Sequence, residues 1–308
     1  MKPQQLIFTT VIFPRKSSET NTLLLVESIR SFAGTLSENP IWIFTPALPQ
    51  QLSTATKNRL EALDTKLISF ALDESKLPFF FASELQAIAF AESMAKTDTE
   101  LLTWLDSNTL ILKEPKEFLI PDEKSLGFRP VHHTLVGSRY NEPLDPFWTQ
   151  IYRSCQVLEE RIFPMETHVD NTIIRPYFNA GILITRPTNQ LFRTWHDTFF
   201  GIYRKAEYKE FYRQDERYHI FAHQAVLSGV ILSLFPKVEL QELPPTYNYP
   251  LHLFSEDVSK TRPSTLEELV TIRHEGFYED PEWIKKIPAK NTLRNWISER
   301  VTTYKSDF

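Results

Sequence analysis

The residues best suited to chemistry lie in the stretch WLDSNTLIL, in which Asp106 and Asn108 stand between two apolar segments. Hard divalent cations such as Mg²⁺ and Mn²⁺ take oxygen ligands from one or two carboxylates together with substrate phosphates. An acid and an amide two residues apart can both reach one such ion if the backbone turns there. Asp, Ser and Asn also begin turns and cap helices, so the tripeptide alone leaves a structural role open.

Two further stretches place polar or small residues next to apolar segments. YFNAGILIT sets Asn179, Ala180 and Gly181 before an expected buried strand, where small residues let a ligand approach the backbone. HQAVLSGVIL sets His223 and Gln224 at the head of an expected apolar helix. The plain alternatives are an asparagine that satisfies a turn and an ordinary helix start.

A last candidate stretch, RHEGFYEDPEW, places His274 beside a glycine and an aromatic residue. A single histidine is more often a hydrogen-bonded structural or surface residue than a metal ligand, so His274 alone indicates no site.

Apolar periodicity predicts the elements that position these residues. Strands are expected over 6–13, 41–44, 66–72, 101–105, 127–131, 181–185, 237–240 and 270–272, and helices over 21–33, 51–63, 83–95 and 291–304. Ser83 and Gln86 predict a capping box at the start of the third helix. Strands and helices that alternate with short links indicate a parallel α/β sheet, which binds ligands beyond the carboxyl ends of its strands. Asp106 follows such an end.

Composition excludes several classes of function. The net charge of −5, without a basic cluster, disfavours nucleic acid and membrane surfaces as partners. Cys155 is the only cysteine, which suits a reducing compartment, and the apolar run at 6–13 is too short to span a bilayer. A cytoplasmic protein without a transmembrane segment is therefore expected. Seven glycines include no Gly-rich phosphate loop.

In their order along the chain, these stretches resemble glycosyltransferase family 8, the glycogenin and lipopolysaccharide galactosyltransferase type, whose members are retaining enzymes of the GT-A fold. WLDSNTLIL is similar to the D-x-D strand of that family, YFNAGILI to its F-N-A-G strand and HQAVL to its D-Q helix. LPPTYNY and HEGFYEDPEW resemble its Leu-Pro…Tyr-Asn and His-x-x-Gly…Pro-Trp elements. The resemblance spans residues 5 to 285.

This resemblance implies a fold and a reaction. The fold would be α/β of the GT-A type, a mostly parallel central sheet flanked by helices in one domain, 1–308. Its parts would be a nucleotide-binding half to about 115, a donor-sugar and acceptor half to about 290 and a C-terminal helix. The reaction would move a sugar from a nucleotide-diphosphate sugar, with UDP the expected nucleotide, to an unknown hydroxyl acceptor.

The resemblance also assigns residues to the cation. Asp106, Asn108 and His274 would hold Mn²⁺ or Mg²⁺, which would neutralise the charge on the departing diphosphate. The donor sugar and nucleotide would meet a second set of residues: Thr9, Thr10, Ala180, Gly181, His223, Asn179 and Gln224. Of these, Asn179 and Gln224 would act together with Asp106 at the reacting centre. Arg129 and His132 lie in a segment that the resemblance does not explain, and we expect one of them to touch substrate.

Three departures from the family pattern bear on activity. Asn108 replaces an acid, so metal affinity should fall, and His223 replaces an acid next to Gln224. His274 is one residue closer to its glycine than the pattern has it. The alternative is therefore a catalytically weak or inactive protein that binds a nucleotide sugar. A sugar nucleotidyltransferase is disfavoured, because residues 6 to 22 lack the Gly-rich phosphate loop of that class.

Overall fold

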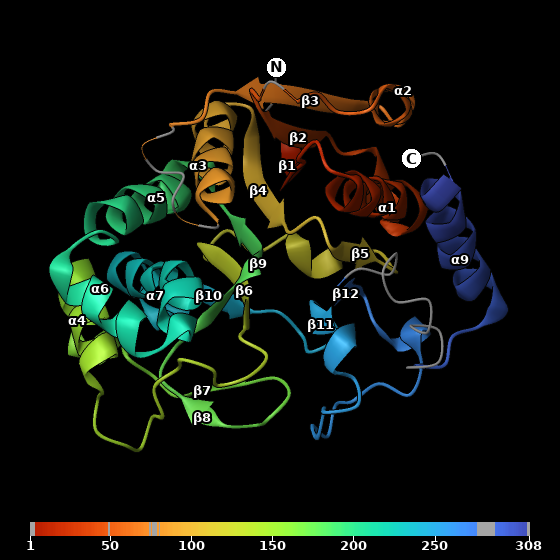
Figure 1. Cartoon of the computed structure of the whole chain (residues 1–308). Coiled ribbons are helices and arrows are strands. Elements are labelled where there is room, and N and C mark those ends of the chain that lie inside the picture. Colours follow the sequence, from red (N-terminus) through yellow and green to blue (C-terminus); the bar gives the residue numbers. More distant parts are fainter. Residues whose placement is uncertain are drawn as a thin grey trace.

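The computed structural model of the chain describes residues 4–48, 50–73, 75, 79, 81–275 and 287–306. Its main sheet has seven strands in the order β10-β6-β9-β4-β1-β2-β3 (Figure 1). These strands are β1 Gln4–Val11, β2 Ile41–Pro46, β3 Thr65–Phe70, β4 Thr99–Leu105, β6 Leu126–Pro130, β9 Phe178–Thr185 and β10 Leu240–Glu242. Only β9 runs against its neighbours, so the sheet is mostly parallel, as the sequence predicts.

Two smaller sheets accompany it. One joins β11 Tyr249–Pro250, β12 Thr271–Arg273 and β5 Thr109–Ile111 in that order. The other pairs β7 Met165–Glu166 with β8 Ile173–Ile174. The pairing of β5 with β12 places residues 271–273 beside the segment that follows β4.

Helices lie on both faces of the main sheet (Figure 1). They are α1 Lys16–Phe32, α2 Thr54–Ala62, α3 Ala82–Ala95, α4 Pro146–Cys155, α5 Leu191–Ile202, α6 Ala206–Gln214, α7 Glu216–Leu234 and α9 Asn291–Ser306. Short 3₁₀ turns are η1 Gly34–Glu38, η3 Lys116–Phe118, η4 Glu159–Arg161, η5 Pro187–Asn189, η6 Lys237–Glu239, η7 Leu251–Leu253 and η8 Leu266–Glu268. None of the described helices is long and apolar enough to cross a membrane.

The central strands are apolar on both faces because both faces are covered. On β1, Ile7 packs into a core with α3, α5 and α7, whereas Leu6 and Phe8 pack into a second core with α1 and α9. Successive side chains of a strand point to opposite faces, which explains this division.

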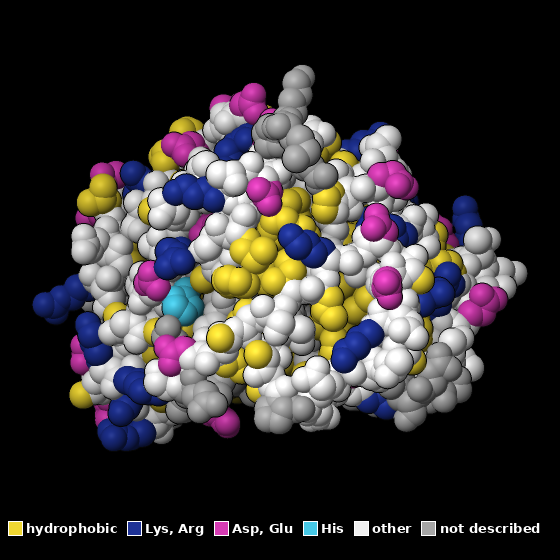
Figure 2. All heavy atoms as spheres, turned by 90° about the horizontal axis from the view of Figure 1, so that it is seen from above, with side chains coloured by type: hydrophobic (Ala, Val, Ile, Leu, Met, Phe, Trp, Pro, Cys, Tyr) yellow, Lys and Arg dark blue, Asp and Glu magenta, His cyan; other side chains and the backbone are white. Residues whose placement is uncertain are grey.

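Edge strand β3 leaves apolar surface at the rim of the sheet. Leu67 on β3 and Phe90 on α3 are 37% and 39% exposed. The ring of Phe90 meets that of Phe44 edge-on at 5.9 Å. In Figure 2, which views the molecule from above, apolar side chains gather near the middle of the face, with Lys and Arg side chains around them.

Three expectations about local structure are wrong. Phe81 rather than Ser83 precedes α3, and the side-chain oxygen of Gln86 accepts the backbone N–H of Asp73 at 2.7 Å, so no capping box forms. Helix α1 begins earlier than expected, at Lys16. Residues 237–239 form a 3₁₀ turn, and β10 follows it.

Two expectations about the site segments also need correction. Asn179, Ala180 and Gly181 lie within β9 rather than before it. His223 and Gln224 lie near the middle of α7, because that helix begins at Glu216, where Asp215 accepts a backbone N–H as its N-cap. The polar residues 216–219 obscure the helix start, since the apolar run begins only after them.

Candidate active site

A cavity of about 560 Å³ lies beyond the carboxyl end of β4. It is lined by residues from segments far apart in the chain, among them Asp106, Asn108, Asn179, Gly181, Gln224 and Arg273. The elements that carry several of these residues, β4, β9, α7 and β12, are labelled in Figure 1. The cavity is therefore at the edge of the sheet where a parallel α/β fold binds its ligands.

The antiparallel pairing of β4 and β9 joins the first two candidate stretches. Leu105 is paired with Ile182, and the backbone N–H of Asp106 donates to the carbonyl of Gly181 at 2.9 Å. Because β9 runs against β4, the amino end of β9 lies beside the carboxyl end of β4. Asp106 and the Asn179–Gly181 segment consequently meet.

The pairing of β5 with β12 brings the third stretch to the same place. Thr109 is opposite Arg273, and the backbone N–H of His274 donates to the carbonyl of Asn108 at 2.9 Å. Arg273 and His274 therefore lie beside Asp106 and Asn108, although the sequence separates them widely.

The carboxylate of Asp106 is engaged by an arginine. Nη2 of Arg273 lies 3.2 Å from Oδ2 of Asp106, and Nε of Arg273 lies 2.9 Å from Oε1 of Glu275. The Arg273 side chain is 22% exposed and that of Asp106 is 36% exposed. The pair thus lies at the cavity wall, partly open to solvent.

Gly181 makes room for this guanidinium. A Cβ atom at Gly181 would stand 2.5 Å from Nη1 of Arg273 and 3.0 Å from Oδ1 of Asn179. Any larger residue would have to displace the arginine, because such distances are well inside van der Waals contact.

The side chains predicted to hold a cation fit it poorly. Asp106 is paired with Arg273, and Asn108 and His274 bring no negative charge. Oδ1 of Asn108 is buried and accepts no hydrogen bond from the described residues, so one oxygen is available. His274 is 2% exposed and is not among the residues that line the cavity. Burial lowers its pKa to about 3, which keeps the imidazole in the neutral form that a metal ligand requires and so does not itself argue against a cation. A guanidinium therefore occupies the place where the cation was expected to meet a carboxylate.

Two amide side chains present donors to the cavity. Oε1 of Gln224 accepts the backbone N–H of Ala180 at 3.0 Å, and Oδ1 of Asn179 accepts the backbone N–H of Gly181 at 2.8 Å. A backbone N–H can only donate, so the oxygen of each amide is the bonded end. The NH₂ group of each side chain is therefore its donor end. That of Gln224 also lies near the buried hydroxyl of Tyr177.

His223 presents an acceptor. Its Nδ1 lies 2.9 Å from the carbonyl of Ile220, which can only accept, so Nδ1 carries the proton and Nε2 has the lone pair. The ring lies between Trp195 and Phe81, and burial lowers the pKa of His223 to about 3. The imidazole is neutral at neutral pH.

The remaining predicted residues fall into two groups. His132 lines the cavity, with Nε2 bonded to the carbonyl of Asn248 at 3.1 Å. Thr9 and Thr10 do not line it: the hydroxyl of Thr9 donates to the carbonyl of Thr103 at 2.9 Å, and both side chains are buried in the sheet. The strand instead presents Val11 and the following Phe13 to the cavity.

Arg129 also lies outside the lining of the cavity. Its guanidinium is 2.9 Å from Oε1 of Glu242, 2.7 Å from the carbonyl of Leu243 and 2.9 Å from Nδ1 of His168. These partners account for it as a buried structural group, so we do not retain it as a donor contact.

Four charged residues at the cavity were not predicted: Arg15, Glu84, Arg273 and Glu275. Arg273 directly precedes His274 in the sequence. Its pairing with Asp106 depends on the small sheet of β11, β12 and β5. Glu84 is an acid at the start of a largely apolar helix, which is a usable signal in the sequence. The Gly276–Trp283 part of the C-terminal element lies outside the described residues.

Comparisons with known proteins agree with this architecture. A family model described as Rhodobacterales glycosyltransferase domain matches residues 9–234. The galactosyltransferase LgtC, solved with donor and acceptor sugar analogs, matches with a TM-score of 0.50 and 13% identity over 98% of this chain and 96% of its own. Mouse xyloside xylosyltransferase 1 matches with a TM-score of 0.50 and 10% identity over 89% and 98%.

The glycosyltransferase GlyE of Streptococcus pneumoniae TIGR4 matches with a TM-score of 0.50 and 12% identity, over 97% of this chain and 64% of its own. No curated protein matches. At such identities the structural likenesses show the fold, which is the GT-A fold that the sequence predicts. Because the family model covers most of the chain, the chain belongs to the Rhodobacterales glycosyltransferase domain family and is a glycosyltransferase.

Proposed function

We propose that this glycosyltransferase moves a sugar from a nucleotide-diphosphate donor, with UDP as the nucleotide, to a hydroxyl acceptor. The observation that carries the proposal is the convergence of Asp106, Asn179 and Gln224 on one cavity beyond the carboxyl end of β4. A nucleotide sugar needs a charged end for its diphosphate and neutral hydrogen-bonding groups for its sugar hydroxyls. The cavity offers both.

The neutral groups define the sugar end. The NH₂ groups of Asn179 and Gln224 donate to sugar oxygens, and Nε2 of His223 accepts from a hydroxyl. Trp195 donates its indole N–H to the carbonyl of His223 at 2.7 Å, which holds that part of α7 in place. We assign the acceptor hydroxyl to the same end, near His223.

The charged end receives the diphosphate. Asp106 and Arg273 meet there, and Phe13 and Arg15 lie on the side of β1 where the nucleotide base would stack or pack. A divalent cation held by Asp106, Asn108 and His274 was the expected means of neutralising the diphosphate. Since those side chains fit a cation poorly, no step of the proposed mechanism depends on one.

The resemblance to a retaining family favours retention of anomeric configuration. In such a transfer the bond from the anomeric carbon to the diphosphate oxygen breaks, the bond to the acceptor oxygen forms on the same face, and the acceptor proton passes to the diphosphate. Asp106 and Glu275 are both paired with Arg273, which favours this route over a covalent intermediate on either acid. The anomer of the product, determined by NMR, tests it.

We further propose that the chain works as a single domain. Strands from both expected halves hydrogen-bond in one sheet, because β4 pairs with both β1 and β9. The site needs residues from both halves.

Binding of UDP-, GDP- and ADP-sugars to the purified chain tests the function, with Gln224→Ala and Asn179→Ala as variants. Each amide lost should weaken binding of the preferred nucleotide sugar about tenfold and leave the bare nucleotide nearly unaffected. Gln214→Ala on α6, an exposed residue outside the cavity lining, is the matched control. Failure of every nucleotide sugar to bind the wild-type chain would contradict the proposal.

A further inference from the structure

We infer that Arg273 is the fixed cation that binds the diphosphate of the donor, in the place where a divalent metal ion was expected. The inference rests on the proposed function and names the group that supplies positive charge to the diphosphate at the charged end of the cavity. It does not follow from the family resemblance, which assigns that role to a metal.

The charges around the cavity require such a group. Three acids line it, namely Glu84, Asp106 and Glu275. A diphosphate that entered among three carboxylates would be repelled unless positive charge faced it. The arginines among the described lining residues are Arg15 and Arg273, and no described lysine lines the cavity.

Two of the four histidines among the described lining residues do not supply that charge. Burial lowers the pKa of His223 to about 3, and burial with the nearby positive charge of Arg273 lowers that of His132 well below its usual value. Both of these rings are neutral at neutral pH, whereas the guanidinium groups of the two arginines are positive at any pH the protein tolerates. The other two histidines, His133 and His252, lie 3.9 Å from Glu256 and Glu275 respectively.

Arg273 is the better placed of the two arginines. The guanidinium of Arg15 lies 5.4 Å from the ring centroid of Phe13, and the described residues give it no ion pair. Arg273 is held from two sides, by Asp106 at 3.2 Å through Nη2 and by Glu275 at 2.9 Å through Nε. A guanidinium fixed in this way loses little side-chain freedom when it binds a ligand.

The geometry leaves donors for a phosphate. A guanidinium has five N–H groups in a planar fork that suits phosphate oxygens, and the two ion pairs involve Nη2 and Nε. Nη1 lies over Gly181, where only the absence of a Cβ atom admits it. The N–H groups of Nη1 are therefore beside the Asn179–Gly181 segment, at the border of the charged and neutral ends of the cavity.

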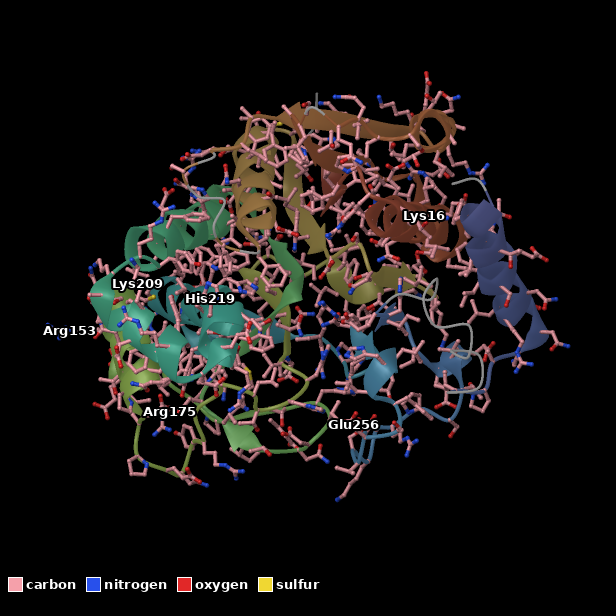
Figure 3. All side chains as sticks on the ribbon, in the orientation of Figure 1. Lys16, Arg153, Arg175, Lys209, His219 and Glu256 are labelled. Atoms are coloured by element: carbon pink, nitrogen blue, oxygen red, sulfur yellow. The ribbon has the colours of Figure 1, made fainter. Side chains whose placement is uncertain are left out.

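The test measures calorimetric binding of UDP and of UDP-glucose to the full chain, in EDTA and in Mn²⁺. The wild type should bind in EDTA with an affinity that Mn²⁺ does not improve. Arg273→Ala should weaken binding about tenfold to a hundredfold, the loss expected for a charged hydrogen bond to phosphate. Arg153→Ala is the control, since Arg153 is exposed on α4 at the outer edge of the molecule (Figure 3).

Two further variants separate the arginine from a metal site. Gly181→Ala should displace the guanidinium and weaken UDP binding, because its Cβ atom would stand 2.5 Å from Nη1 of Arg273. This variant tests the role of the guanidinium even if Arg273→Ala does not fold. Asp106→Asn should tighten UDP binding in EDTA, since it removes a negative charge from the charged end while Glu275 still holds the arginine.

The outcomes are distinct. Binding that appears only with Mn²⁺, or Asp106→Asn binding more weakly while Arg273→Ala binds like the wild type, overturns the role of Arg273 and leaves the transferase function standing. A wild-type chain that binds no nucleotide or nucleotide sugar under either condition overturns the proposed function and this inference with it.

Discussion

Glu84 of α3 and Asp106 at the end of β4 are carboxyl groups that line the same cavity. Burial raises the pKa of Glu84 to about 7, and the negative charge of Asp106 adds to that rise. Oε2 of Glu84 is buried and accepts no hydrogen bond from the described residues. The protonation state of Glu84 therefore changes near neutral pH, next to the place proposed for the diphosphate.

This relationship predicts a pH-dependent affinity for donor. As the pH rises through about 7, Glu84 ionises and adds a negative charge that opposes the diphosphate, so UDP-glucose should bind more weakly. UDP-glucose is the suitable ligand because its diphosphate does not titrate in this range. Calorimetry from about pH 6 to about pH 8 measures the effect, and Glu84→Gln should abolish it. An identical profile in that variant would assign the pH dependence to another group.

The same shift predicts a pH-dependent stability. The folded-state pKa of about 7 lies above the ordinary value of 4.5, so between these values the folded chain binds the extra proton. The free energy of unfolding should consequently fall as pH rises from about 4.5 to about 7 and level off above that. Burial raises the pKa of Glu92 to about 7 as well, so Glu84→Gln should reduce the slope of this part of the profile in urea unfolding and leave the part due to Glu92. A steeper fall in the variant would contradict the assignment.

Asn108→Asp should raise the affinity of the site for a cation. The change places a second carboxylate beside the carboxylate of Asp106, which is paired with Arg273, and two carboxylates can hold Mn²⁺ where one paired carboxylate does not. Mn²⁺ should raise the Tm of the variant and leave the Tm of the wild type unchanged. Asn248→Asp, at another buried asparagine, is the comparison. Equal Mn²⁺ stabilisation of the wild type and Asn108→Asp would show that the native site already holds the ion.

Glu92→Ala should destabilise the packing of α3 against α5. The carboxylate of Glu92 is 2% exposed and accepts the backbone N–H groups of Phe192 at 3.1 Å and Arg193 at 2.8 Å, at the start of α5. Removing it leaves two buried donors unsatisfied, at a cost of about 2–4 kcal/mol in the free energy of unfolding. Urea unfolding measures this. Glu100→Ala, an exposed acid on β4, should change stability by less than about 0.5 kcal/mol.

Glu27→Ala should loosen the C-terminal helix. Glu27 of α1 is 3% exposed and is bonded by Arg59 at 2.6 Å and by Arg300 and Tyr304 of α9. Its loss leaves these groups without their shared acceptor and should cost roughly 2–3 kcal/mol, less than for fully buried pairs because the Arg59 side chain is half exposed. The exposed Glu299 on α9 is the control position in urea unfolding. Equal effects of Glu27→Ala and Glu299→Ala would contradict a specific role of Glu27 in docking α9.

Much of the framework is readable from the chain because local patterns encode it. Apolar runs separated by amphipathic stretches predict β1, β2, β3 and β4 and the helices between them, and the order of the site segments indicates the family. Leu293, Ile297 and Val301 recur at helical spacing and are buried in α9. These features depend on neighbours in sequence, which is why they need no tertiary information.

The predicted site and the lining of the cavity differ where a side chain's partner is remote in the sequence. By its position in the sequence, Thr9 is a plausible ligand contact. In the structure, its hydroxyl donates a hydrogen bond to the carbonyl of Thr103. By its position in the sequence, Arg129 is a plausible substrate contact. In the structure, the pairing of β6 with β10 places Glu242 and Leu243 beside it, and its guanidinium bonds to both. A sequence pattern indicates that a polar residue needs a partner, and only the fold determines which one.

By itself, the sequence determines that polar and small residues interrupt apolar segments in the order typical of glycosyltransferase family 8. This order depends only on residue type and on spacing along the chain. Tertiary structure alone decides that the carboxylate of Asp106 meets the guanidinium of Arg273 over Gly181. That meeting depends on the β4–β9 and β5–β12 pairings, which join residues too far apart in the chain for any local pattern to connect them.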